Sequence, residues 1–153
     1  MLQLTREQFE RIVEQGRNGK PLEICGLLAG INTTNDSDDD ITQVAAVYPV
    51  SSDDRSELTY TMNPLQQLRA EKEISARGLQ VVGIYHTHPA TVAYPSSTDV
   101  ARAHWGDTDD LIFPDYSYLI VSLRDPARPE LHSFKIKGRR IPQDIVEEPV
   151  TIR

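Results

Sequence analysis

The feature that most constrains the fold is a β-type apolar run that ends in two histidines. Residues 79–85 have the composition of a buried strand, and His86, Thr87, His88 and Pro89 follow directly. Side chains alternate along a strand, so the two imidazoles project from one face and Thr87 from the other. Pro89 has no N–H group and takes the chain out of the sheet just after the second ring. The sequence therefore predicts a strand end that presents two rings to one metal ion.

A carboxylate follows these histidines at a distance that a loop can span. Residues 90–95 are long enough to reverse the chain and bring Asp99 back to both rings. Two imidazoles and one carboxylate leave a fourth tetrahedral position for water, which is typical of a catalytic zinc site. Two other interpretations stay open: the histidines as a surface pair, and Ser96 to Asp99 as a helix capping box in which Asp99 bonds the backbone of Ser96. A capping box alone does not explain the His-x-His-Pro before it.

One acid stands at the start of an earlier apolar run. Residues 21–31 carry a single charge, on Glu23. Because a buried acid without a partner is costly, Glu23 is either solvated at the mouth of a strand or a general base for water at the metal. Cys25 lies on the same side in a strand, which makes it a possible fourth ligand. A single buried cysteine is more often a small apolar filler.

The amino-acid composition limits the classes of protein to which the chain can belong. The 153 residues are 39% hydrophobic, which predicts one domain with a single core over residues 1–153. A net charge of −7 argues against a nucleic-acid partner, because phosphate binding needs clustered lysine and arginine. No apolar run approaches the roughly 20 residues needed to cross a bilayer, and the N-terminus has no signal-peptide apolar region. A single cysteine excludes an internal disulfide framework and fits a reducing cytoplasm.

Local signals predict an alternation of strands and helices. A capping box at Thr5 starts a helix that ends at Gly16 or Gly19, and Asn63 caps a second helix that Gly78 closes. The remaining expectations are strands at 21–31, 41–50, 57–62, 116–123 and 130–136, a hairpin connection at 32–40, a short helix at 98–105, an irregular loop at 106–115 and one more short strand within 141–153. His104 is predicted to point away from the metal and His132 to lie on the surface.

With Glu23 upstream, the pattern becomes Glu, then His-x-His-Pro, six residues, and Ser-x-x-Asp. This resembles the JAMM motif of the MPN+ metallopeptidases, zinc isopeptidases that include proteasomal and endosomal deubiquitinases and stand-alone bacterial and archaeal enzymes. The segments Glu-Ile-Cys-Gly-Leu-Leu-Ala-Gly, Ile-Tyr-His-Thr-His, Ala-Tyr-Pro-Ser-Ser-Thr-Asp-Val and Val-Ser-Leu-Arg-Asp-Pro are similar to the bacterial branch, and the likeness spans roughly residues 4–150. Pro89 is a feature of the wider family.

The resemblance implies a fold, residue roles and a substrate. The implied fold is α/β, a curved mixed sheet flanked by helices and similar to cytidine deaminases. It implies His86, His88 and Asp99 as zinc ligands, Glu23 as the general base, and Ser96 beside the developing oxyanion. The implied substrate is a ubiquitin-like sulfur-carrier protein, cleaved after its C-terminal Gly-Gly to release cysteine or a short peptide.

Two rival functions fit the same resemblance. One is a deubiquitinase-like isopeptidase that cuts lysine linkages. The other is a non-catalytic scaffold, as in MPN− relatives that have lost their ligands, and the complete set of motif residues argues against it.

Overall fold

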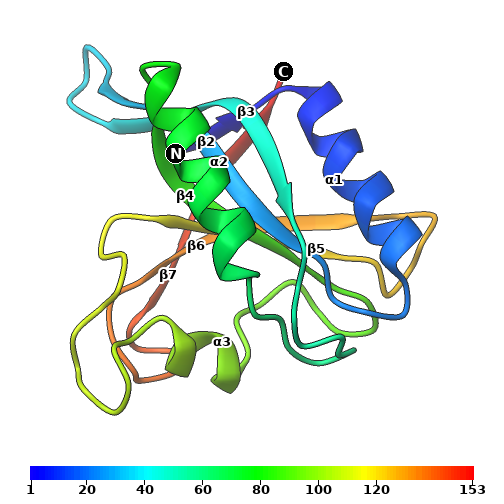
Figure 1. Ribbon diagram of the computed structural model, residues 1–153. Helices are drawn as coiled ribbons and strands as arrows, with labels where there is room; N and C mark the ends of the chain where they lie inside the picture. Colours follow the sequence, from blue (N-terminus) through cyan, green and yellow to red (C-terminus); the bar gives the residue numbers. More distant parts are fainter.

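The computed structural model describes residues 1–153, which form one curved, mixed, eight-stranded sheet with three helices (Figure 1). In chain order the elements are β1 (Leu2–Leu4), α1 (Arg6–Gly19), β2 (Cys25–Thr34), β3 (Asp40–Val50), α2 (Pro64–Ala76), β4 (Gln80–His88), α3 (Ser97–Arg102), β5 (Ser117–Ser122), β6 (Glu130–Ile136), β7 (Ile145–Glu148) and β8 (Val150–Ile152). The α/β class and the curved mixed sheet are confirmed. None of the helices combines the length and the apolar composition that a membrane span requires.

The strand order is β7-β6-β5-β4-β2-β3-β1-β8. Its two outer strands, β7 and β8, are neighbours in sequence and only Pro149 lies between them. The sheet is therefore curled so far that the chain passes from one edge to the other within a single residue. At the centre, β4 pairs antiparallel with β2 and parallel with β5.

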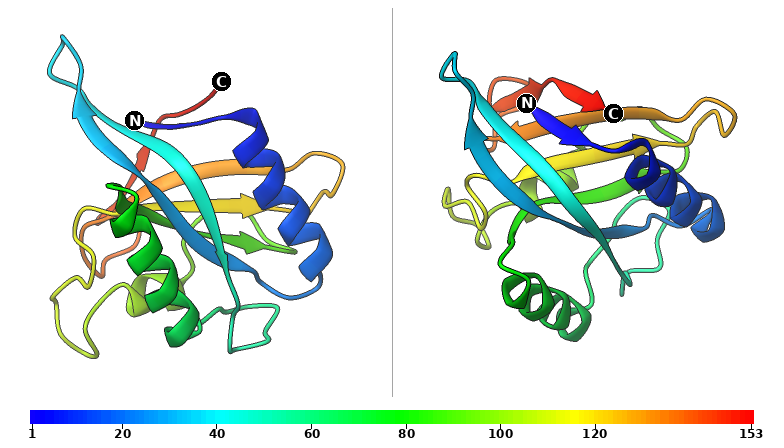
Figure 2. Two further views of the ribbon diagram at one scale, coloured as in Figure 1. Left: turned by 45° about the horizontal axis from the view of Figure 1, so that its top comes forward. Right: turned by 90° about the horizontal axis from the view of Figure 1, so that it is seen from above.

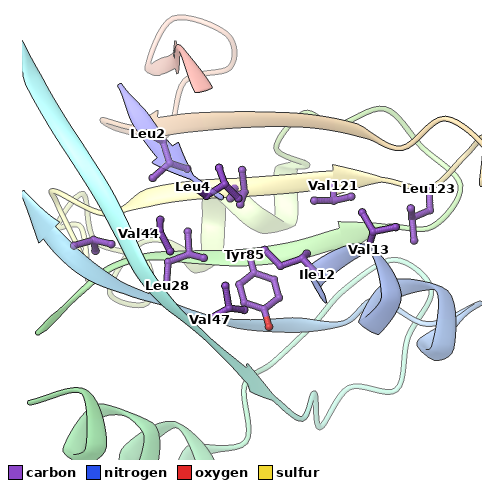
Figure 3. Close-up of a cluster of buried hydrophobic side chains, with 12 residues drawn as sticks. Leu2, Leu4, Ile12, Val13, Leu28, Val44, Val47, Tyr85, Val121 and Leu123 are labelled. Carbon is purple, nitrogen blue, oxygen red and sulfur yellow. The ribbon is translucent and has the colours of Figure 1, made fainter. Parts of the chain in front are cut away.

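Helix α1 covers one face of the sheet. Its capping box is present, since Thr5 Oγ1 accepts from the Gln8 N–H at 3.1 Å and Gln8 Oε1 accepts from the Thr5 N–H at 2.9 Å. Ile12 and Val13 of the helix pack against strand side chains in the core labelled in Figure 3. Gly16 lies so close to β4 that an added Cβ would be 2.8 Å from Thr87 Cγ2. Thr87 therefore faces α1, and the histidines on either side of it face away.

The opposite face carries a second core. Ala70 and Ile74 of α2 and Val100 of α3 pack there with Ile84 of β4 and Cys25 of β2. His86 and His88 follow Ile84 on this face of β4. Helix α3 therefore lies on the same side of the sheet as these two predicted metal ligands.

Three predicted elements differ from the structure. Residues 32–34 were expected in a loop but belong to β2, in a ribbon that projects from the body (Figure 2). Residues 57–62 were expected as a strand but form only an isolated bridge between Ser52 and Met62. The tail contains two short strands instead of one, because Pro149 lacks the N–H needed to continue a ladder.

Candidate metal centre

Four of the predicted residues meet in one buried cluster. Glu23, His86, His88 and Asp99 each offer a ligand atom, and these atoms lie within 4.8 Å of one another. The four residues are 4%, 1%, 4% and 9% exposed, in that order. The interpretations of the histidines as a surface pair and of Glu23 as a solvated residue are therefore wrong.

Pairing between β2 and β4 positions Glu23. Cys25 is the register partner of His86, and hydrogen bonds to β4 extend one residue before β2, to Ile24. The Thr87 N–H donates to the Ile24 carbonyl at 3.1 Å, and the Ile24 N–H donates to Thr87 Oγ1 at 3.1 Å. This exchange holds Glu23 beside the last residues of β4, on the same face as the histidines.

Asp99 belongs to the capping box of α3 and to the cluster at once. Ser96 Oγ accepts from the Asp99 N–H at 3.0 Å, and Asp99 Oδ2 accepts from the Ser96 N–H at 2.9 Å. The same Oδ2 lies 3.2 Å from Nε2 of both His86 and His88. The capping box that the sequence left open is therefore present, and it places the same carboxylate oxygen in the cluster.

The rings are oriented with Nε2 toward the cluster. His88 Nδ1 lies 2.7 Å from the Val92 carbonyl, which can only accept, so Nδ1 carries a proton and, in the neutral ring, Nε2 keeps its lone pair. The Nε2 atoms of His86 and His88 are 3.1 Å apart. Tyr60 stacks on the His86 ring with centroids 4.5 Å apart and planes inclined by 30°.

The donor set fits a divalent metal ion. Three ligand atoms, from His86, His88 and Asp99, are separated by 3.1 to 3.2 Å. Ligand atoms 2.0 to 2.1 Å from a tetrahedral zinc ion lie roughly 3.3 Å from one another. Glu23 Oε1 is buried and has no hydrogen-bond partner in the protein. A cation would satisfy the facing lone pairs, and water beside it would give Glu23 a partner.

The pKa shifts of Glu23 and Asp99 also fit a site for a cation. Burial, with a smaller contribution from Asp99, raises the pKa of Glu23 to about 8. Burial also acts to raise the pKa of Asp99, but the neighbouring His86 and His88 and the Ser96 N–H outweigh it and hold that pKa well below its usual range. Neither acid forms an ion pair with lysine or arginine. A divalent cation here would balance the charges of Glu23 and Asp99.

Ser96, predicted beside the oxyanion, lies at the rim of the cluster as the residue that caps α3. Its hydroxyl oxygen accepts from the Asp99 N–H, while its own proton has no acceptor in the structure. That proton is therefore available to a bound molecule.

The cysteine and the other two histidines lie outside the cluster. Cys25 is a buried filler as favoured: its Sγ donates to the Val50 carbonyl at 3.3 Å, and burial raises the pKa of its thiol to about 12. His104 bonds the Val100 carbonyl at 2.7 Å, and the half-exposed His132 contacts Glu147, as predicted for structural and surface residues.

The residues that cover the cluster were not predicted from the sequence. Arg102 of α3 donates through Nη1 to Asp54 Oδ2 at 2.7 Å and to the Tyr60 carbonyl at 2.6 Å. These bonds hold residues 51–62 against α3 and keep Tyr60 over His86. The only available signal was the position of Arg102 three residues after Asp99, a spacing that places two side chains on one side of a helix.

Two cavities open beside the cluster. One, of about 380 Å³, is lined by Glu23 and by residues of the loop after β3. The other, of about 270 Å³, is lined by Asp99 and Arg102 together with apolar side chains that include Phe113. Trp105, which follows α3, is 60% exposed.

The fold and this cluster define an α/β protein of the JAB/MPN type with a candidate metal centre. Among solved structures, a JAB1/MPN domain protein from Archaeoglobus fulgidus superimposes with a TM-score of 0.51 at 18% identity, covering 99% of this chain and 96% of that one, a likeness of fold alone. A protein from Desulfitobacterium hafniense gives a TM-score of 0.78 at 35% identity over 100% of this chain and 93% of its own.

The chain belongs to the family of prokaryotic homologs of the JAB domain, whose model matches residues 5–137. It is similar to the CysO-cysteine peptidase of Mycobacterium tuberculosis, at 33% identity over 99% of this chain and 91% of that protein. It is also similar to the desampylase of Haloferax volcanii, at 33% identity over 79% of this chain and 80% of that protein.

Proposed function

We propose that the protein is a zinc-dependent peptidase that cleaves after the C-terminal Gly-Gly of a ubiquitin-like sulfur-carrier protein and releases cysteine or a short peptide. The buried cluster of two imidazoles and two carboxylates carries this proposal. The names of two relatives, a CysO-cysteine peptidase and a desampylase, support hydrolysis of such adducts or conjugates.

His86, His88 and Asp99 would hold the metal ion. When bound, zinc lowers the pKa of water and polarises a carbonyl group. Glu23 takes a proton at Oε1, the buried atom that has no other partner, and returns it to the leaving amine. Because the Glu23 carboxylate is buried and held in one place, it is suited to take up a proton and return it.

Ser96 would donate its hydroxyl proton to the oxyanion that develops on the scissile carbonyl. The backbone N–H of Asp99 already bonds the Ser96 oxygen at 3.0 Å, which fixes the oxygen without using its proton. A donor held in place before the reaction is worth more than one that must be oriented during it.

The partner must present a thin extended tail. Glycine residues have no side chains to exclude from a narrow channel, and an extended tail can pair with a strand edge. The net charge of −7 favours a carrier with basic patches.

The test combines elemental analysis with mass spectrometry of a ubiquitin-like carrier bearing a C-terminal cysteine. We expect one zinc ion per chain and a carrier that becomes lighter by one cysteine residue. Cleavage of a lysine-linked conjugate with an intact cysteine adduct would favour the isopeptidase. Absence of both metal and cleavage would favour the scaffold.

A further inference from the structure

The cavity beside Glu23 contains an arginine without a partner. Its volume is about 380 Å³, and its lining includes Glu23, Arg55 and the polar side chains of Ser51, Ser52 and Gln66. A volume near the lower limit of small-molecule sites suits a single amino acid or a short peptide. The Arg55 residue is exposed, and no hydrogen bond or ion pair involves its side chain, so its guanidinium donors are available to a ligand.

The backbone holds Arg55 next to the predicted base. The Glu23 N–H donates to the carbonyl of Ser56 at 2.8 Å, so the residue that follows Arg55 is bonded directly to Glu23. Arg55 itself has a φ of +45°, in the left-handed region that non-glycine residues rarely adopt. A strained conformation persists only where surrounding contacts impose it, and such residues concentrate at binding sites.

Two of the three acids within two residues of Arg55 are engaged elsewhere, and the third, Glu57, forms no ion pair with it. Asp54 bonds Arg102 at 2.7 Å and Thr59 at 2.8 Å, and Asp53 accepts from Asn63 Nδ2 at 3.1 Å. Arg55 is therefore a cation without an ion-pair partner at the cavity that Glu23 also lines. A planar guanidinium recognises a carboxylate through two parallel hydrogen bonds.

The direction of the substrate follows from the role of Glu23, so this step depends on the proposed function. Glu23 returns its proton to the leaving amine, and a leaving group that extends from Glu23 into the cavity of about 380 Å³ would reach Arg55. In a released α-amino acid, the carboxylate is two bonds from the amine nitrogen. In a lysine isopeptide, four methylenes separate the amine from the backbone, and its carbonyl is part of the next peptide bond.

We propose that Arg55 binds the α-carboxylate of the leaving amino acid and makes the enzyme selective for carriers that end in a single added residue. A lysine-linked conjugate places no carboxylate in this cavity, so it would lack the ion pair with Arg55. The substrate class is thus a free C-terminal amino-acid adduct.

The test uses CysO bearing a C-terminal cysteine and the same carrier bearing cysteinamide, which removes only the negative charge. We expect the zinc-loaded protein to cleave the acid with a kcat/KM about 10- to 100-fold above that of the amide, mainly through KM. Arg55→Gln should abolish this preference by slowing cleavage of the acid alone, and Arg55→Lys should restore part of it. Arg6→Gln, at the far end of α1, is the matched control and should change neither substrate.

A second readout is independent of turnover. Fluorescence anisotropy of labelled acid and amide adducts, measured on the metal-free protein, should show tighter binding of the acid by wild type and equal binding by Arg55→Gln. Equal binding of acid and amide by wild type, or an Arg55→Gln effect of the same size on both, would overturn the inference. Preferential binding of the acid without cleavage of either adduct would support the carboxylate site and contradict the proposed peptidase activity.

Discussion

A single oxygen of Asp99 serves the helix and the cluster together. Oδ2 accepts from the Ser96 N–H at 2.9 Å and faces both imidazole Nε2 atoms at 3.2 Å. The helix cap therefore fixes the carboxylate before any metal arrives, and this reduces the cost of organising the site on binding.

Replacing Glu23 separates metal binding from proton transfer. Glu23→Gln keeps the shape of the side chain and leaves the other three members of the cluster in place, so zinc content should remain at one per chain. Turnover of the carrier–cysteine adduct should fall by about 10² to 10⁴, because glutamine cannot accept the proton. Steady-state kinetics with elemental analysis of the same sample checks both values. Turnover equal to wild type would remove Glu23 from the mechanism.

Ser96 combines capping with its proposed contact to the oxyanion, and Ser96→Gly separates the two. Glycine is an acceptable N-cap, so unfolding by urea should show a loss of only a few tenths of a kcal/mol. Removal of an oxyanion donor should lower kcat by about 10² to 10³. Ser96→Ala is the comparison: it should lose similar activity and about 1 kcal/mol of stability. A fully active Ser96→Gly variant would limit Ser96 to capping.

For single residues, the sequence predicted the candidate metal ligands but not the side chains that surround them. The positions of His86 and His88 on one face follow from the two-residue period of a strand. Tyr60 and Arg102 could not be placed in the same way, because their contacts join a loop without periodicity to a helix distant in sequence.

Among the elements, the loop of residues 51–62 shows why local patterns failed. Tyr60 and Met62 resemble the alternating apolar residues of a strand, but Met62 packs into the core while Tyr60 stacks on His86. The loop backbone pairs with itself only around the Ser52–Met62 bridge, and further bonds come from the Ser52, Ser56 and Arg102 side chains. The opposite error occurred in residues 32–34, where exposed polar side chains concealed a backbone ladder.

The ion pair between Arg102 and Asp54, which holds this loop against α3, predicts how stability depends on pH. The hydrogen bond from Arg102 lowers the pKa of Asp54 from 3.8 to about 2. The stabilisation from a depressed acid pKa is present above pH 3.8 and is lost as the pH falls through about 2. Arg102→Gln should therefore raise the Asp54 pKa toward its usual value, which an NMR titration of the carboxyl carbon measures.

The corresponding energy is small, because both side chains are partly exposed. The pH-dependent stability difference between wild type and Arg102→Gln should not exceed about 1 kcal/mol, measured by urea unfolding at neutral and acidic pH. Arg124→Gln, which removes an exposed pair with Glu130, is the control and should leave the Asp54 pKa unchanged. An unchanged Asp54 pKa in Arg102→Gln would assign the shift to Thr59 and Thr61 instead.

For the whole molecule, the curled sheet brings the chain ends together. Parallel pairing joins β1 to β8, and the Arg153 N–H donates to the Leu4 carbonyl at 3.0 Å. Leu2 and Leu4 are fully buried as a result. Helix α1, which begins directly after β1, is thereby fixed over Thr87 on the face opposite to the cluster. The sequence predicted most of the strands, but their order depends on long-range pairing that no local pattern records.

The candidate metal centre couples the fold to metal binding, because its ligands come from the segment before β2, the end of β4 and the start of α3. Zinc bound only by the folded protein at 100 times its dissociation constant should add about 2.7 kcal/mol to the unfolding free energy. For a chain of this length that corresponds to a rise in Tm of roughly 5 to 10 °C, measured by calorimetry before and after chelation.

Asp99→Asn is the matched control for this measurement, because asparagine keeps an oxygen that can accept from the Ser96 N–H and removes the charge that faces the histidines. The metal-free Tm of this variant should stay close to that of metal-free wild type. The rise in its Tm on adding zinc should be a small fraction of the wild-type rise. A response equal to wild type would mean that Asp99 only caps α3. A wild-type Tm insensitive to zinc would contradict the metal centre itself, since a cation held by three distant segments cannot bind without favouring the folded state.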